Sequence, residues 1–183
     1  MTRLLGAILA GGRSSRFGSD KAMALLAGET LLAHVVAAMR DQCDALILCG
    51  RQGEGLAWVG DRPGPDMGPL AGINAALHHA LDAGFDAVLT VGCDTPVLPP
   101  GLAARLSSGG QGGYVADMPI IGLWPATLAP HLDAHLAAGG KRSIRGWAAQ
   151  AGIAGIDPGV IIANINRVED LDALIAGGPF RPG

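Results

Sequence analysis

The chain has 183 residues, of which 49% are hydrophobic and 16% are charged, and this composition excludes a disordered, low-complexity protein. The net charge of −3 argues against a broad binding surface for nucleic acid or anionic lipid. The length is typical of one domain, so we expect residues 1–183 to fold around one hydrophobic core.

The first half of the chain alternates short apolar runs with helical patterns. The run at 4–9 is followed by glycines and is typical of a buried strand in a parallel sheet. Thr30 is an expected helix cap, because an apolar stripe follows it at Leu31, Leu32, Val35, Val36 and Met39. The remaining patterns predict a strand at 45–49, a loop at 55–68, a helix at 69–83 and a strand at 87–91.

The second half continues this alternation with shorter elements. In chain order we expect a helix with Pro99 and Pro100 in its first turn, strands near Tyr114 and at 120–123, helices at 128–138 and around Trp147, a strand at 160–162 and a helix at 168–175. This alternation predicts a three-layer α/β/α sandwich with a mainly parallel, Rossmann-like sheet. Ligands bind such sheets beyond the carboxyl ends of the strands. The loops after Leu9, Cys49 and Val91 should therefore share one edge.

The loop after the first predicted strand combines small residues with cations. Backbone N–H groups in such a loop can approach an anion, and Arg16 and Lys21 add positive charge for adjacent phosphates. The loop matches neither the dinucleotide fingerprint G-x-G-x-x-G nor a Walker sequence. It is a candidate phosphate-binding loop, and a glycine-rich turn with solvated cations is the alternative.

Two further motifs fall at the same predicted edge. Asp94 follows a strong apolar strand, and one carboxylate with waters and substrate phosphates is the usual way to bind Mg²⁺. A helix-capping role is the alternative for this residue. Gly68 opens the turn Gly-Pro-Leu-Ala-Gly before a predicted helix, whose first N–H groups suit a ribose or a phosphate.

These motifs, in this order, resemble those of the small nucleotidyltransferases, and most closely the molybdenum cofactor guanylyltransferases. The resemblance covers nearly the whole chain. The residues that carry it are Leu9–Gly12 with Arg16, Gly18, Asp20 and Lys21, then Asp61, Gly68–Gly72, Cys93–Pro96, and finally Asn164–Asn166 with Glu169–Leu171.

The resemblance implies one nucleotidyltransferase domain of the nucleotide-diphospho-sugar transferase fold. It implies an Mg²⁺-dependent enzyme that transfers GMP from GTP to the terminal phosphate of molybdopterin and releases pyrophosphate. In this chain the nucleotide would be contacted by Leu9, Ala10, Gly11, Gly12, Asp61 and Gly68. The catalytic residues would be Arg16 and Lys21 on the phosphates and Asp94 on the metal, while Asn164 and Asn166 would face the pterin.

The choice of base follows from the first loop. It opens with Ala-Gly-Gly, whereas related cytidylyltransferases tend to open with Ala-Ala-Gly, and this difference favours GTP. The chain departs from the family pattern at Leu48, where Asn is frequent, at Met118, where the neighbouring proline often has a histidine beside it, and at Arg167-Val168, where Thr-Pro is common. A cytidylyl- or uridylyltransferase for another phosphorylated acceptor and a non-catalytic GTP-binding module are the alternatives.

The histidines and cysteines have structural interpretations. A phosphate nucleophile is already anionic near neutral pH, so the reaction needs charge neutralisation more than a histidine base. His131 and His135 have the i, i+4 spacing of metal ligands, but the sequence near them offers no third ligand. Three cysteines without a C-x-x-C pair indicate reduced thiols in a cytoplasmic protein.

The expected partners are GTP and molybdopterin. Molybdenum-insertion proteins or molybdoenzyme chaperones are candidate protein partners. We expect no nucleic acid and no membrane among the partners, because the charge is slightly negative and no apolar run approaches the ~18 residues that a membrane span needs.

Overall fold

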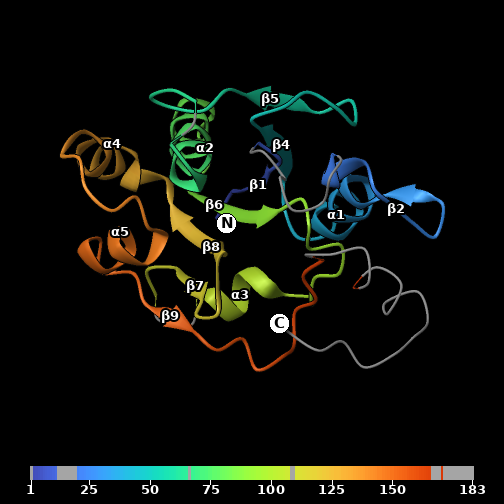
Figure 1. Ribbon diagram of the computed structural model, residues 1–183. Coiled ribbons are helices and arrows are strands. Elements are labelled where there is room, and N and C mark those ends of the chain that lie inside the picture. The colour runs from blue at the N-terminus through green and yellow to red at the C-terminus, as the bar shows by residue number, and fades with distance from the viewer. Residues whose placement is uncertain (1, 12–19, 66, 108–109, 166–169, 171–183) are drawn as a thin grey trace.

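The computed structural model describes residues 2–11, 20–65, 67–107, 110–165 and 170 (Figure 1). Its central sheet contains strands β1 (Leu4–Leu9), β4 (Ala45–Cys49), β5 (Ala57–Val59), β6 (Ala87–Gly92), β7 (Gly113–Val115), β8 (Met118–Pro125) and β9 (Gly155–Ile156). Their order across the sheet is β5-β4-β1-β6-β8-β7-β9. Strands β2 (Leu25–Leu26) and β3 (Glu29–Thr30) form a separate small hairpin.

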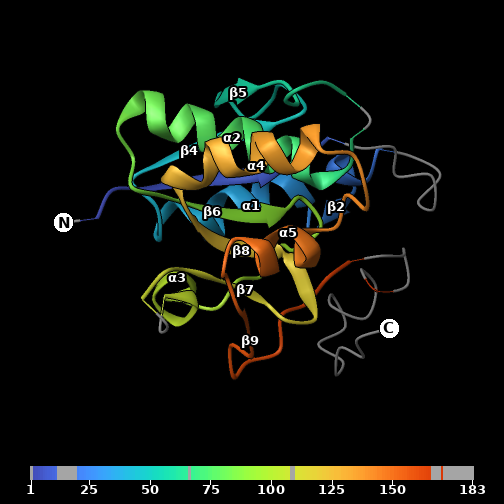
Figure 2. The same cartoon turned by 90° about the vertical axis from the view of Figure 1, so that its left-hand side faces the viewer.

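Helices cover both faces of this sheet. The α-helices are α1 (Leu31–Arg40), α2 (Pro69–Ala83), α3 (Leu102–Leu106), α4 (Ala129–Ala137) and α5 (Ile144–Gln150), and the 3₁₀-helices are η1 (Lys21–Met23) and η2 (Ala126–Leu128). Buried residues of α2, α4 and α5 pack on one face of the sheet, and those of α1 and α3 pack on the other. The expected three layers are therefore confirmed (Figures 1 and 2). Within the described residues, no helix has the length and apolar character to cross a membrane.

The sheet is mainly parallel, as expected. Strand β1 lies parallel to both β4 and β6, and β4 lies parallel to β5. The register places Leu9 opposite Cys49 on one side and opposite Gly92 on the other. Strand β8 is antiparallel to β6 and β7, so the start of β8 lies at the edge where β6 ends. The carboxyl ends of β1, β4 and β6 thus lie side by side at one edge, and we refer to it as the site edge.

The two longest helices agree with their predicted boundaries. The Thr30 hydroxyl accepts a hydrogen bond of 3.0 Å from the backbone N–H of Ala33 and begins α1, whose predicted apolar stripe is buried. Helix α2 ends at Gly84, which has the left-handed conformation that favours glycine (φ 73°). Its first turn has Pro69, where a missing N–H costs nothing.

Three predicted elements differ from the structure. The loop predicted at 55–68 contains strand β5 at Ala57–Val59, which pairs in parallel with β4. Helix α3 begins at Leu102 after a left-handed Gly101, so Pro99 and Pro100 precede the helix instead of forming its first turn. The strand predicted at 160–162 is wrong, because these residues form no strand and Ile161 is 79% exposed. The helix predicted at 168–175 lies outside the described residues.

Candidate active site

The loops that follow β1, β4 and β6 are joined side by side at the site edge. The backbone N–H of Ala10 donates to the Cys49 carbonyl at 3.0 Å, and the N–H of Cys93 donates to the Leu9 carbonyl at 3.2 Å. The prediction that these loops share one edge is thus confirmed. The Leu9 side chain is buried in the core, so any contact of this residue with a ligand would use its backbone.

The Asp61 carboxylate lies beside three glycines. One follows β1, one follows β4 and one lies on α2. A Cβ atom added at Gly11, Gly50 or Gly72 would lie 3.8, 3.6 or 3.7 Å from the Asp61 Oδ1 atom. At Gly50 such a Cβ would also come within 2.6 Å of the Gly11 Cα, and φ there is +83°, so only glycine fits. The result is a backbone-lined surface, the Asp61 surface, with a carboxylate acceptor beside it. A carboxylate acceptor suits a ring that carries N–H donors.

Asp61 also affects a buried thiol. Burial raises the pKa of Cys49 to about 12, and the nearby Asp61 charge adds to this effect. Burial likewise raises the pKa of Cys43 to about 12, with a further contribution from Asp44. At pH 8 only about one such thiol in 10⁴ is ionised, and the thiolate is the reactive form.

We therefore expect iodoacetamide at pH 8 to leave Cys43 and Cys49 unmodified in the native protein. Both should be modified after unfolding in guanidinium chloride, which supplies the matched control. Peptide mass spectrometry measures the two residues separately. Rapid modification of Cys49 in the folded protein would contradict the buried position described above.

Asp94 lies in a tight turn after β6 that is held on two sides. The backbone N–H of Thr95 donates to the Gly92 carbonyl at 3.3 Å, and the Thr95 hydroxyl lies 3.4 Å from Asp94 Oδ1. The N–H of Ile165 donates to the Asp94 carbonyl at 2.8 Å. This bond brings Asn164 beside the Asp94 turn, whereas Asn166 lies outside the described residues.

The donor set at this turn fits Mg²⁺. Among the residues that the structure describes, no group of three or more His, Cys, Asp or Glu side chains is arranged to hold a metal ion. A site built on Asp94 would therefore supply one carboxylate and take its other oxygens from water and a triphosphate. Mg²⁺ is bound in this way, whereas structural Zn²⁺ needs four protein ligands.

Asp20 follows the candidate phosphate-binding loop and fixes the turn after it. Its carboxylate accepts from the N–H of Ala22 at 3.2 Å, and its carbonyl accepts from the N–H of Met23 at 3.0 Å, so the 3₁₀-turn that begins at Lys21 is held in place. Gly12 and Arg16 lie outside the described residues. Gly68 precedes α2 with φ at +75° and leaves the start of that helix without a side-chain cap.

Arg51 is a cation at the site edge that sequence reasoning did not assign. Its Nη1 lies 2.9 Å from Asp20 Oδ1, and this bond lowers the pKa of Asp20 and raises that of Arg51. Cys93, just after β6, also contributes to the raised pKa of Arg51. The Arg51 Nε is buried without a hydrogen-bond partner. No local pattern indicates this pair, because its members are 31 residues apart.

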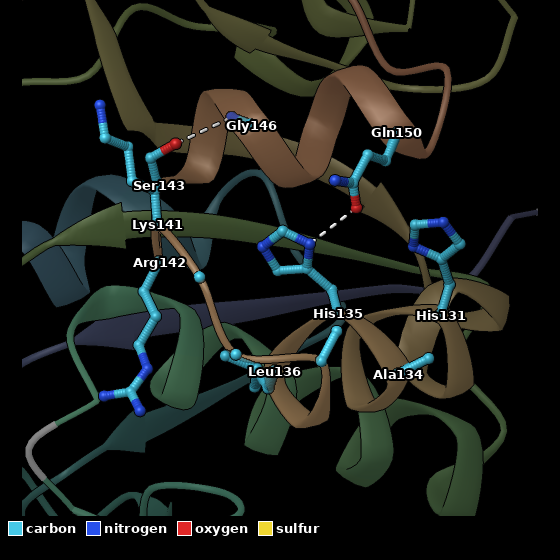
Figure 3. A pocket seen from close by; sticks show the side chains of 12 residues that line it. His131, Ala134, His135, Leu136, Lys141, Arg142, Ser143, Gly146 and Gln150 are labelled. Carbon is cyan, nitrogen blue, oxygen red and sulfur yellow. Dashed lines mark hydrogen bonds between the residues drawn. The ribbon is translucent and has the colours of Figure 1, made fainter.

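A cavity of about 510 Å³ between α4 and α5 does not gather comparable chemistry (Figure 3). The His131 Nδ1 accepts from the Trp147 indole at 3.0 Å, and the His135 Nδ1 lies 2.7 Å from Gln150 Oε1. Each histidine thus uses a ring nitrogen for packing the two helices. Lys141 and Arg142 line the cavity but extend in opposite directions in Figure 3.

A family model and two curated relatives match most of this chain. A family model described as the MobA-like NTP transferase domain matches residues 6–152. A molybdenum cofactor guanylyltransferase of Rhodobacter capsulatus is 36% identical over 92% of this chain and 93% of its own. One of Cereibacter sphaeroides (strain ATCC 17029) is 39% identical over 92% of this chain and 94% of its own.

Solved structures share the fold at lower identity. Molybdopterin-guanine dinucleotide biosynthesis protein A from Archaeoglobus fulgidus superposes with a TM-score of 0.75 at 20% identity, covering 94% of this chain and 97% of the other. The 2-C-methyl-D-erythritol 4-phosphate cytidylyltransferase from Thermus thermophilus has a TM-score of 0.63 at 14% identity, with 93% and 96% covered. The fold is therefore shared between proteins named for guanine and for cytosine nucleotides.

Proposed function

The chain belongs to the family of MobA-like NTP transferases, and on this premise we propose that it transfers GMP from GTP to the terminal phosphate of molybdopterin. The observation that carries the proposal is the extent of the similarity to the two molybdenum cofactor guanylyltransferases, 92% of this chain in each case. A relative that shared only the nucleotide-binding half of the fold would match a smaller part of the chain. The protein is a nucleotidyltransferase, and we propose that residues 1–183 form one such domain, which works in the cytoplasm on GTP and molybdopterin.

The proposed reaction is an in-line displacement at the α-phosphorus of GTP. An oxygen of the acceptor phosphate forms a bond to that phosphorus, and the bond between the α-phosphorus and the oxygen that bridges to the β-phosphate breaks. Pyrophosphate leaves with the bonding electron pair. Both reactants are anions before they meet, so catalysis depends on alignment and on neutralising charge.

The predicted site residues fit these two tasks, and among them Arg16 and Asn166 lie outside the described residues. The Asp61 surface holds the guanine, with the Asp61 carboxylate accepting from the base. Arg16 and Lys21 neutralise the phosphates, while Asn164 and Asn166 hold the pterin side of the acceptor. Because Asn164 lies beside the Asp94 turn, acceptor and metal would meet at the end of β6.

We assign the metal to Asp94. When bound, Mg²⁺ neutralises phosphate charge and aligns the triphosphate. The carboxylate of Asp94 supplies the protein ligand, and the hydrogen bonds of its turn keep that ligand at the end of β6.

The decisive experiment measures pyrophosphate release from GTP, CTP, ATP and UTP with Mg²⁺ and molybdopterin. We expect kcat/KM for GTP to exceed that for ATP and CTP at least about tenfold, because an acceptor that the wrong base leaves unpaired costs binding energy. Chelation of Mg²⁺ should stop release, and added Mg²⁺ should restore it.

Two results would favour a function other than GMP transfer. Equal use of GTP and CTP would favour a cytidylyltransferase, a name that one structural neighbour bears. Tight GTP binding without pyrophosphate release in the presence of acceptor would indicate a non-catalytic GTP-binding module.

A further inference from the structure

A polar network joins α4 to the segment that carries Asp61. The Asp133 carboxylate, on α4, accepts from the Asn74 side-chain amide at 2.7 Å and contacts the His78 Nε2 at 2.9 Å. It also lies 3.5 Å from the Arg62 Nε. Burial would raise the pKa of Asp133, but the hydrogen bonds from Asn74, His78 and Arg62 outweigh burial and lower it. Asp133 is therefore an anion at neutral pH.

The network holds Arg62 at three points. Its backbone N–H donates to the Ala71 carbonyl at 3.1 Å, and its carbonyl accepts from the Asn74 amide at 3.4 Å. Its guanidinium forms the ion pair with Asp133. Because Asp61 is the preceding residue, fixing Arg62 restrains the backbone at Asp61, whose carboxylate faces the three glycines.

Packing alone does not account for this network. Asn74 is fully buried on α2, and its Oδ1 has no hydrogen-bond partner. A buried amide with an unpaired oxygen is costly, whereas an apolar residue at the same position would pack two helices without that cost. The amide nitrogen is the part that is used, since it joins Asp133 to the Arg62 carbonyl.

We propose that Asp133 is a positioning residue for base recognition: through Arg62 and Asn74 it fixes Asp61 against the glycine surface and so sets the preference for a purine that carries N–H donors. The proposal rests on the proposed function, since it gives Asp61 a base to recognise. Asp133 itself touches no substrate. Its effect should appear in the choice between nucleotides, because a misplaced Asp61 loses more hydrogen bonding to a base with a 2-amino donor than to a base without one.

The test compares GTP with ITP, whose base lacks the 2-amino donor of guanine. In Asp133→Ala, we expect the ratio of kcat/KM for GTP to that for ITP to fall about tenfold, the size of effect when a hydrogen bond to a charged group is lost. The change should lie mainly in KM for GTP. Asp133→Asn keeps the shape of the side chain and loses its charge, so it should show a smaller fall and serves if the alanine variant does not fold.

Three companion variants separate the possible causes. Asp61→Ala should lose the GTP preference by itself, and adding Asp133→Ala to it should change the ratio no further, because the two residues act through one contact. Gln150→Ala removes the hydrogen bond between α4 and α5 instead and should leave the ratio unchanged. Melting temperatures of all variants record any loss of stability.

The outcomes are distinct. An unchanged ratio in Asp133→Ala, together with a lost preference in Asp61→Ala, overturns the positioning role and leaves the proposed function standing. An unchanged ratio in both variants shows that Asp61 does not recognise the base, and the inference fails with it. Failure of the unmodified protein to release pyrophosphate from GTP refutes the proposed function itself.

Discussion

Replacing Asp94 with asparagine is expected to lower turnover at least about a hundredfold, the effect of losing a large electrostatic contribution in the transition state. The substitution keeps the shape of the side chain but removes the charge that would hold Mg²⁺. The fold should persist, because Ile165 bonds to the Asp94 backbone and an amide oxygen can still accept from the Thr95 hydroxyl. Pyrophosphate release at saturating GTP and Mg²⁺ measures the effect.

A matched carboxylate tests whether the loss is specific to this position. Asp117 is exposed in the turn between β7 and β8, at the site edge where β8 begins, and Asp117→Asn changes the net charge by the same amount. This variant should keep the rate of the unmodified protein. A near-normal rate for Asp94→Asn would remove Asp94 from the metal site.

The layers of the fold could be predicted because apolar periodicity reports burial directly. The stripe on α1 and the continuous apolar runs of β1 and β6 each face a core, and the structure buries them as expected. The prediction of a strand at 160–162 failed because an apolar run does not specify a hydrogen-bonding partner. Strand β9 at 155–156 pairs with β7 instead, and the chain beyond it passes along to Asp94.

The candidate site could be predicted only where one short segment carries the signal. Asp94 at the end of an apolar strand and the glycines of the first loop are signals of this kind. The Asp61 surface is only partly of this kind. The resemblance includes Asp61 and the Gly68–Gly72 segment, but no local pattern indicates that Gly50 packs beside them. The polar pairs are equally hidden, since Asn74 and Asp133 are 59 residues apart and meet only when α4 packs on α2.

Lys21 follows Asp20, which pairs with Arg51 at the end of the candidate phosphate-binding loop. Asp20 binds the Arg51 guanidinium and the N–H of Ala22, so the backbone at Lys21 is held at the site edge before any nucleotide binds. We propose that the Lys21 ammonium acts on the leaving pyrophosphate, whose charge grows as the bond to the α-phosphorus breaks. Its contribution should therefore be larger in the transition state than in the bound triphosphate.

We accordingly expect Lys21→Ala to lower kcat on the order of a hundredfold, while KM for GTP rises much less. Lys141→Ala is the matched control, because Lys141 is an exposed lysine in the loop between α4 and α5 and the substitution removes the same charge. Steady-state rates over a range of GTP concentrations separate kcat from KM. A change confined to KM would make Lys21 a residue that binds the triphosphate equally in both states, and the charge on the leaving group would then have to be neutralised by Arg16, Arg51 or the metal at Asp94.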